Sequence, residues 1–412
     1  MVVMTNFLYI DPGTGSMLFS ILIGLAAAAV FGAKALFLKL KFLFSGGKSD
    51  AKNSSQKIPY VIYSDHKRYW NVFKPICDEF EKRKIPLVFY TSSEDDPALT
   101  CKYEYVKTEF IGSGNKAFAK LNFLNAGILL STTPGLDVYQ WKRSKNTAWY
   151  VHIPHSIDDV PATYRMFGTD YYDAFLTSGN HQEKVIRKLE SLRNIKSKEV
   201  VCTGSTYLDS MKQRKENLPE IPKNKKPVVL VAPSWGINGI LSKFGSRFID
   251  ALVKTEYEII IRPHPQSVNS EKQMLDDLKN KYPKITWNFD NDNFDVLNKA
   301  DIMISDFSGV IYDYTLIFNK PLIYADTEFD TLPYDADWLD EKIWSLRVLP
   351  KIGIMLQEKD FDNLKNVIDS ALNSSALEQG RKEIAEEAWK HTGESAMRVA
   401  DYMISKKEEL KL

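Results

Sequence analysis

Short apolar segments rich in β-branched and aromatic residues recur along most of the chain, and longer segments of helical character separate them. In the first half they lie at 60–63, 86–90, 127–131, 148–153, 174–177 and 200–203. In the second half they lie at 228–232, 258–262, 301–305 and 322–325, and the pattern from 361 to 404 is helical. Strands that alternate with helices form parallel sheets with helical layers. The sequence therefore predicts an α/β fold.

Two polar stretches divide the 412 residues, a length that suits about two domains. The stretch at 45–57 is rich in Gly and Ser, and the stretch at 212–226 holds two prolines and no apolar periodicity. We expect two doubly wound domains that face one another across a cleft. The predicted parts are a membrane anchor (1–44), a flexible linker (45–57), an N-terminal domain (58–211), an interdomain linker (212–226) and a C-terminal domain (227–412).

A run without charge at 16–33 is the one membrane-scale segment of the sequence. No Lys or Arg precedes it, so it does not resemble a signal peptide, and Lys34, Lys39, Lys41 and Lys48 follow it. The positive-inside tendency then places the rest of the chain in the cytoplasm. We expect a single-pass transmembrane helix in the cytoplasmic membrane; the alternative is a buried or interfacial amphipathic helix.

Charge and cysteine content exclude several classes of protein. The formal net charge is +1, which removes the broad cationic surface of a nucleic-acid-binding protein. Cys77, Cys101 and Cys202 are far apart, so they indicate neither a disulfide nor a zinc site. No HExxH, P-loop or GxSxG motif occurs. These patterns give no sign of a metal or other cofactor.

Polar turns follow the three strongest strands of the second half, where ligands of parallel sheets bind. The first turn contains Ser234, and the second contains Arg262 and His264, each followed by a proline. The third turn precedes a predicted helix. That turn holds Ser305, Asp306, Ser308 and Gly309, with Asp313 one helical turn further on. Arg and His donors and a glycine-containing turn at a helix start suit a phosphate or diphosphate. The alternative is that the serines and Asp306 cap the helix.

Two histidines follow a strand of the first half. A transferase that uses a hydroxyl acceptor needs a base, and histidine suits that role near neutral pH. His155 lies in the turn and is the better candidate for the base. His152 is a candidate substrate-binding residue, although its strand-like surroundings favour a hydrogen-bonded core histidine. Asp158 and Asp159 follow closely and either orient an imidazole or solvate the loop.

Together these motifs resemble the CDP-glycerol glycerophosphotransferases, the family of teichoic acid primases and polymerases, over residues 60–404. The segment 305–314 (SDFSGVIYDY) is similar to the family's Ser/Thr-Asp-Tyr-Ser-Ser followed by an aspartate. The segment 262–265 is similar to Arg-x-His-Pro, and 232–235 to Ala-Pro-Thr-Trp. Gly204 and Asp209 fit a weaker spacing, and 392–395 resembles Asp-Gly-x-Ser. The family's second serine and the arginine after Ala-Pro-Thr-Trp are replaced by Gly309 and Gly236.

The resemblance implies a GT-B-like pair of Rossmann-like domains, with a CDP-polyol donor held largely by the C-terminal domain. It carries the catalytic base onto His155 and the second catalytic histidine onto His264. Arg262, Ser305, Asp306, Ser308 and Asp313 would surround the donor. The implied reaction moves glycerol phosphate from CDP-glycerol to a hydroxyl of a lipid-linked or glycan acceptor in cell-surface polymer synthesis and releases CMP. No cofactor beyond this donor is implied.

Two other functions fit the same motifs. One is a glycosyltransferase that uses a nucleotide sugar, and the other is a catalytically silent, tethered nucleotide-binding protein. A basic stretch at 184–198 mixes Glu with Lys and Arg at helical spacing. That pattern is typical of a solvated helix face, with contact to anionic lipid as the alternative.

Overall fold

The computed structural model describes residues 57–157, 159–219, 226–290 and 292–412. Residues 58–412 form one compact unit. The predicted anchor at 1–44 and all but the last residue of the predicted linker at 45–57 lie outside the described residues. Within the described ranges, no helix is long and apolar enough to cross a membrane.

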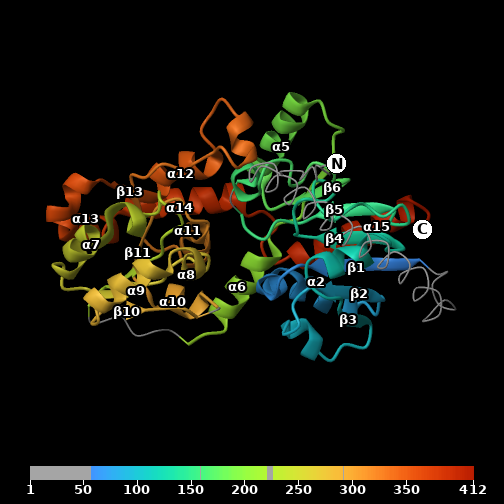
Figure 1. Cartoon of the computed structure of the whole chain (residues 1–412), viewed down its shortest axis with the longest axis horizontal. Helices are drawn as coiled ribbons and strands as arrows, with labels where there is room; N and C mark the ends of the chain where they lie inside the picture. The colour runs from blue at the N-terminus through green and yellow to red at the C-terminus, as the bar shows by residue number, and fades with distance from the viewer. Residues whose placement is uncertain (1–56, 158, 220–225, 291) are drawn as a thin grey trace, which may run out of the picture. The chain divides into compact units, whose positions relative to one another are not determined.

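The first lobe is a seven-stranded parallel sheet in the order β3-β2-β1-β4-β5-β6-β7, with its helices (Figure 1). Its strands are β1 (Ile58–Ser64), β2 (Leu87–Thr91), β3 (Val106–Phe110), β4 (Ala126–Ser131), β5 (Trp149–His152), β6 (Ala174–Thr177) and β7 (Glu199–Cys202). Its helices are α2 (Trp70–Lys82), α3 (Asn115–Leu121), α4 (Val160–Thr163), α5 (Asn180–Arg193) and α6 (Thr206–Glu216), with short 3-10 helices η1 (Lys67–Tyr69) and η2 (Pro97–Thr100).

The second lobe is a six-stranded parallel sheet in the order β10-β9-β8-β11-β12-β13, also with its helices. Its strands are β8 (Val228–Val231), β9 (Glu258–Ile261), β10 (Thr286–Trp287), β11 (Ile302–Ser305), β12 (Leu322–Ala325) and β13 (Gly353–Leu356). Its helices are α7 (Ile240–Val253), α8 (Ser267–Ser270), α9 (Lys272–Lys281), α10 (Phe294–Lys299), α11 (Val310–Tyr312), the π-helix η3 (Asp313–Ile317), η4 (Asp335–Trp338), α12 (Trp344–Ile352), η5 (Glu358–Asn363), α13 (Leu364–Leu372) and α14 (Ser375–Ala388).

Each sheet is buried on both faces. On β1, Ile62 packs in one apolar cluster while its neighbours Val61 and Tyr63 pack in another. On β8, Leu230 and its neighbour Val231 likewise belong to different clusters. Continuous apolar strands are expected where helices cover both faces of a parallel sheet. The predicted α/β architecture with two parallel sheets is confirmed.

The course of the chain between the lobes differs from the predicted boundaries at 212 and 227. The polar segment from 212 begins as the second half of α6, where Arg214 pairs with Asp292 and Asp295 of the second lobe. The last helix, α15 (Ser395–Glu409), belongs to the first lobe, because Val399 and Met403 pack against the core around β1. The C-terminal segment therefore crosses back instead of ending in the second lobe.

The crossing segment explains why Gly204 and Asp209 stand where they do. Asp209 accepts the indole N–H of Trp389 (2.9 Å) and the backbone N–H of Ser395 (3.1 Å). Gly204 has φ +87°, and a Cβ there would lie 2.5 Å from the carbonyl oxygen of Lys390. Only glycine accepts both the dihedral and the close approach. These residues of the family-like pattern hold the C-terminal segment on the first lobe.

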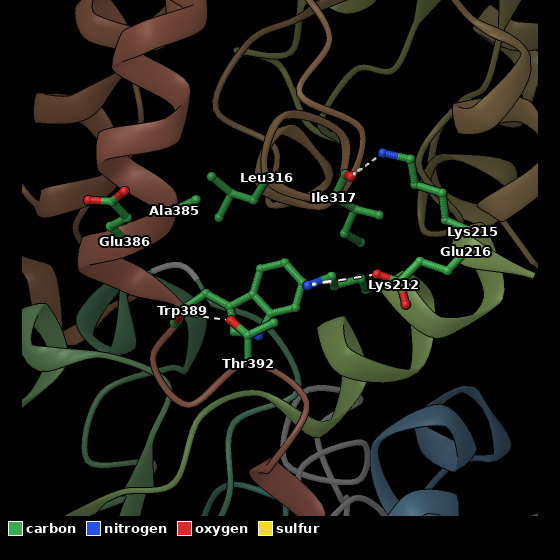
Figure 2. Close-up of a pocket in the computed structure, with 9 residues that line it drawn as sticks. All are labelled: Lys212, Lys215, Glu216, Leu316, Ile317, Ala385, Glu386, Trp389 and Thr392. Atoms are coloured by element: carbon green, nitrogen blue, oxygen red, sulfur yellow. Dashed lines mark hydrogen bonds and ion pairs between the residues drawn. The ribbon is translucent and has the colours of Figure 1, made fainter.

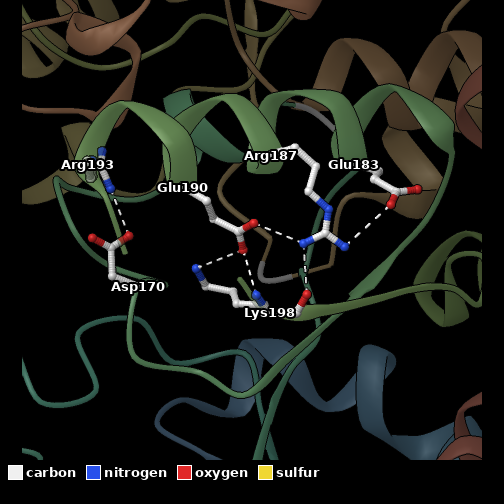
Figure 3. Close-up of polar contacts among 6 residues, drawn as sticks. All are labelled: Asp170, Glu183, Arg187, Glu190, Arg193 and Lys198. Atoms are coloured by element: carbon white, nitrogen blue, oxygen red, sulfur yellow. Dashed lines mark hydrogen bonds and ion pairs between the residues drawn. The ribbon is translucent and has the colours of Figure 1, made fainter. Parts of the chain in front are cut away.

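A second connection joins the lobes through buried ions. Arg193 of α5 pairs with Asp170 of its own lobe (2.8 Å) and with Asp335 of the second lobe (2.5 Å). Figure 3 shows the Arg193–Asp170 pair beside the network around Glu190 on the same helix. Burial raises the pKa of Asp335 and the charge of Arg193 opposes that rise. Breaking such a pair leaves an uncompensated buried charge, so the contact keeps the lobes in register.

Candidate active site between the strand ends of the two lobes

His155 lies in the loop that leaves β5 in the first lobe. Its Nδ1 is 3.3 Å from the hydroxyl of Thr132, which follows β4. Its ring lies 4.8 Å from the ring of Tyr69, between centroids. The side chain is half-buried. Adjacent strand ends and η1 therefore fix the position of the imidazole.

His155 is neutral at pH 7 in the free protein. Burial lowers its pKa to about 4, and the charge of Arg68 acts in the same direction. If Nδ1–H donates to Thr132, Nε2 carries a lone pair that accepts a proton. A bound anion would offset the charge of Arg68 and make Nε2 more basic.

His264 lies in the loop that leaves β9 in the second lobe. Its Nδ1 accepts the backbone N–H of Gln266 at 3.1 Å, so the neutral ring carries its proton on Nε2. Burial lowers its pKa to about 4, helped by Arg68 and opposed by Glu271. The ring is therefore a neutral hydrogen-bond donor at pH 7.

Arg68 links the two loops. It lies on η1 of the first lobe with an exposed side chain, yet its charge lowers the pKa of both His155 and His264. Electrostatic effects of this kind require proximity. Both histidines consequently lie within electrostatic range of one exposed cation, which suits an anion.

Asp65 lies near Arg68, directly after β1. Burial raises the pKa of its carboxyl, opposed first by the nearby hydroxyl of Thr133 and then by its own backbone N–H and the charges of Arg68 and His66. Its Oδ1 is buried and makes no hydrogen bond to the described residues. The sequence analysis missed both Asp65 and Arg68. The rule that ligands bind after strand ends applies to β1 as well, and applying it there would have found both residues.

Arg262 is engaged within its own lobe. Its guanidinium donates to the side chain of Asn288 and to the carbonyl oxygen of Asp290 (2.7 Å), in the loop after β10. Burial lowers its pKa, and the charges of Asp290 and Asp292 oppose this effect. Arginine has five N–H donors, so these two bonds leave others for a ligand.

Ser305 and Asp306 build the turn after β11. The Ser305 hydroxyl donates to the carbonyl oxygen of Ala232 at 2.6 Å. The buried Asp306 carboxylate accepts the backbone N–H groups of Ser234 (2.9 Å), Ile240 (2.9 Å) and Phe307 (2.7 Å). These bonds fix the loop after β8 over the end of β11. Both side chains therefore fix the backbone of the loops that follow β8 and β11.

The rest of the turn leads into the helix. The carbonyl oxygen of Ser308 accepts the N–H of Ile311 (3.1 Å), and Gly309 has an ordinary helical φ of −58°. Asp313 accepts the hydroxyl of Tyr207 at 3.1 Å, which joins α6 to η3. A π-helix following α11 is a geometry that often marks functional sites.

His152 lies in the core of the first lobe. The rings of Tyr164 (4.9 Å), Tyr172 (4.9 Å) and Phe175 (5.0 Å) surround it. It is completely buried, and neither ring nitrogen bonds to another described residue. Burial holds its pKa well below the usual range, so it stays neutral. The ring of Tyr164 lies between the two histidines' surroundings, since it also contacts the half-buried His155 (5.8 Å between centroids).

A pocket of about 380 Å³ lies where α6, η3 and the end of α14 meet (Figure 2). Its lysines already have partners: Lys215 donates to the carbonyl oxygen of Ile317 (2.8 Å), and Lys212 pairs with Glu216 (3.8 Å). It contains neither His155 nor His264. Across the described residues, no group of three or more His, Cys, Asp or Glu side chains is placed to hold a metal ion.

Comparison with known proteins agrees with the motifs. Residues 158–339 match the family model described as CDP-Glycerol:Poly(glycerophosphate) glycerophosphotransferase. The predicted resemblance to this family is confirmed. The match includes His264 and the turn after β11 and leaves out His155, so the role of His155 rests on geometry. No curated protein sequence matches the chain.

Solved structures share the fold at low sequence identity. The wall teichoic acid polymerase TagF has a TM-score of 0.56 and 14% identity, with 94% of this chain and 98% of that chain covered. A crystal of the same polymerase soaked with CDPG gives 0.56 and 13%, with 95% and 99% covered. A putative UDP-N-acetylglucosamine 2-epimerase from Listeria monocytogenes gives 0.55 and 12%, with 86% and 97% covered. These likenesses show a GT-B-like fold and no more.

Proposed function

We propose that this chain, of which residues 158–339 match the glycerophosphotransferase family model, transfers glycerol phosphate from CDP-glycerol to an acceptor hydroxyl and releases CMP. The acceptor we propose is a membrane- or lipid-linked glycan or polyol in the synthesis of a teichoic acid-like polymer. The observation that carries the proposal is that His155 and His264 follow strands of different lobes, have fixed ring contacts and both lie within electrostatic range of Arg68. A neutral imidazole with an available nitrogen, a neutral N–H donor and a cation are what phosphoryl transfer to a hydroxyl needs.

The step is an in-line displacement at the β-phosphorus of CDP-glycerol. Nε2 of His155 takes the proton of the acceptor hydroxyl while its oxygen bonds to phosphorus. The bond from that phosphorus to the bridging oxygen breaks, and CMP leaves with the electron pair. The products are a phosphodiester, CMP and one proton, which His155 passes to solvent. The reaction as written needs no redox or group-carrying cofactor.

Each remaining group has a place in this step. Arg68 and the Nε2–H of His264 face the diphosphate and stabilise the charge that develops on the leaving CMP. The turn from Ser305 to Ser308 presents backbone to the donor, with Asp306 fixing its shape. Ser234, Gly309 and Asp313 remain predicted donor contacts, and Arg262 contributes through its unused N–H groups.

Product analysis tests the reaction class. Purified full chain is mixed with labelled CDP-glycerol and lipid-linked acceptor, and the product is measured by mass spectrometry. We expect CMP and an acceptor heavier by one glycerol phosphate. Thermal shifts with CDP-glycerol, CDP-ribitol, UDP-sugars and GDP-sugars give the donor class. Stabilisation by UDP- or GDP-sugars alone, or donor binding without any product, would contradict the proposal.

We also propose that residues 1–44 anchor the protein in the cytoplasmic membrane, with the two lobes in the cytoplasm. The uncharged run at 16–33 and the lysines after it support this. Two arginines in the run, Ile21→Arg with Leu25→Arg, should move the full chain from the membrane to the soluble fraction. Leu36→Arg, beyond the run, is the matched control. An unchanged distribution of the double variant would argue against the anchor.

A further inference from the structure

A segment of the second lobe reaches the first lobe beside the loop that follows α4. This segment, the strap, comprises residues 327–338; it follows β12 and ends with η4. Tyr334 forms an isolated antiparallel bridge with Arg165, and the carbonyl oxygen of Pro333 accepts the N–H of Met166 at 3.2 Å. These backbone contacts pair the strap with the first lobe.

Asp335 holds the strap in place through a buried carboxylate. One carboxylate oxygen accepts the backbone N–H of Phe167 at 2.8 Å and pairs with Arg193 of α5 at 2.5 Å. The guanidinium carbon of Arg193 lies 4.9 Å from the ring centroid of Phe167 and 5.3 Å from that of Trp338. A buried carboxylate that loses its cation is strongly destabilising, so these contacts keep the strap on the first lobe.

Phe167 has a backbone conformation that a bulky residue rarely adopts. Its φ is +66°, in the left-handed region. Such a conformation costs free energy and persists only where the surroundings hold it. Phe167 is 38% exposed, so burial of its side chain does not hold it, and its N–H bonds to Asp335 of the other lobe. The conformation of the loop around Phe167 therefore depends on the strap.

The same loop contacts the proposed base. Tyr164 is buried, three residues before Phe167, and its ring lies 5.8 Å from the ring of His155. The turn between them is tight, because a Cβ on Gly168 would lie 3.0 Å from the Cβ of Tyr164 and 2.9 Å from the carbonyl oxygen of Arg165. A change at Phe167 therefore reaches Tyr164 and, through its ring, His155.

The other end of the strap contacts the turn that is predicted to hold the donor. The ring of Phe329 lies 5.4 Å from the ring of Phe307, which belongs to the turn after β11. It also lies 5.2 Å from the ring of Tyr334, which is bridged to Arg165. One row of contacts thus runs from the donor turn through the strap to the loop beside His155.

We propose that Phe329 and Asp335 are positioning residues, through which the strap couples donor binding at the turn after β11 to the position of His155. The inference rests on the proposed function, because it takes CDP-glycerol as the ligand of that turn. A donor that binds more tightly while the strap is docked makes the docked state more populated. The docked strap holds Phe167 in its left-handed conformation and Tyr164 against the base.

Hydrogen exchange tests this coupling without the transfer reaction, because amide exchange reports local opening. Full chain in detergent is placed in D2O with and without saturating CDP-glycerol, and mass spectrometry follows the peptide that covers residues 164–168. We expect the donor to slow exchange about fivefold or more in the wild type. Phe329→Ala should abolish this slowing, with CDP-glycerol affinity by calorimetry changed less than about twofold. Phe123→Ala, at an exposed aromatic position outside the strap, is the control and should retain the slowing.

Asp335 provides a second test, in the rate of CMP release. Asp335→Ala should lower kcat about tenfold with KM for CDP-glycerol unchanged, because the loop beside the base loses its support. Asp335→Asn keeps an acceptor oxygen for the Phe167 N–H and should restore most of kcat. Breaking a buried ion pair destabilises the fold, so Phe329→Ala, at a half-buried position outside that pair, is the primary test.

The possible outcomes separate the two proposals. Failure of the wild type to bind CDP-glycerol would overturn the proposed function, and this inference with it. Donor binding with unchanged exchange at 164–168 would overturn the coupling alone. Slowing that persists in Phe329→Ala would show that the donor acts on the loop without the strap. A rise of KM for CDP-glycerol at unchanged kcat in Asp335→Ala would make Asp335 a support of the donor side; each of these results contradicts the proposal.

Discussion

The histidine loops of the two lobes differ in what holds their rings. In the second lobe, Nδ1 of His264 accepts a backbone N–H from Gln266 of the same loop. In the first lobe, Nδ1 of His155 faces the hydroxyl of Thr132, which can donate or accept. The neutral His264 ring is thus limited to one tautomer, whereas His155 has two. One loop presents a permanent donor and the other a group that can take a proton.

The supports of the two loops differ as well. The His264 loop is closed within its lobe, where its carbonyl oxygen accepts the N–H of Ser267 at 2.9 Å. The His155 loop is held by the second lobe, because Asp159 accepts the N–H of Ser345 on α12. The position of the proposed base therefore depends on the relation between the lobes, and that of the donor does not.

The largest effect is expected at His155. His155→Asn should lower the rate of CMP release about 1,000-fold, because the acceptor hydroxyl loses its base. CDP-glycerol affinity should stay as in the wild type. His391→Asn, at an exposed position, is the matched control and should keep full activity. A His155→Asn variant that transfers at the wild-type rate would remove the functional difference between the loops.

A smaller loss of activity is expected for substitutions of His264. A glutamine should restore activity there but not at His155. His264→Ala should lower kcat/KM for CDP-glycerol about 100-fold, as for loss of one donor to a developing charge. His264→Gln should recover much of this loss, since an amide N–H still donates. His155→Gln should recover nothing, since an amide is not a base. Rescue of His155 by Gln and not of His264 would reverse the two roles.

Much of the fold follows from the apolar pattern, with three strands missed. Each strand that was predicted from an apolar run is present. β3, β10 and β13 lie at the edges of the sheets, and all of them are partly exposed. Edge strands bury one side less completely, so they lack a continuous apolar run. The return of α15 to the first lobe was also missed, because an amphipathic helix does not specify which sheet covers its apolar face.

The site follows from the sequence only in part. The strand-end rule pointed to His155 and His264, because prolines and apolar runs mark those turns. Arg68 lies in a run of charged residues that reads as a solvated loop, so it was missed. Ser305 and Asp306 remain predicted donor contacts, and their side chains also bond to backbone, which the sequence did not specify. The sequence shows which hydrogen bonds a side chain can make, but the partner that it bonds to depends on the fold.

The dependence of His155 on the other lobe gives the third prediction. Asp159→Ala removes the acceptor of Ser345 and should lower kcat about tenfold through misplacement of the loop, with KM for CDP-glycerol unchanged. Asp159→Asn retains an acceptor oxygen and should restore most of kcat. Asp340→Ala, on an exposed side chain nearby in sequence, is the control. A rise of donor KM without a change in kcat would show that Asp159 supports the donor side instead.

The smallest effect concerns what the two loops share, a histidine pKa of about 4 in the folded protein against an ordinary value of 6.5. Between those values the unfolded chain binds more protons, so stability should fall as the pH falls from about 6.5 to about 4 and be independent of these groups above that range. Urea unfolding at a series of pH values measures the slope. His155→Asn and His264→Asn should each make the slope shallower by a similar amount, because each removes one such proton. If the slope changed for only one variant, the two rings would not be equally desolvated. The two loops would then differ in histidine pKa as well as in tautomer.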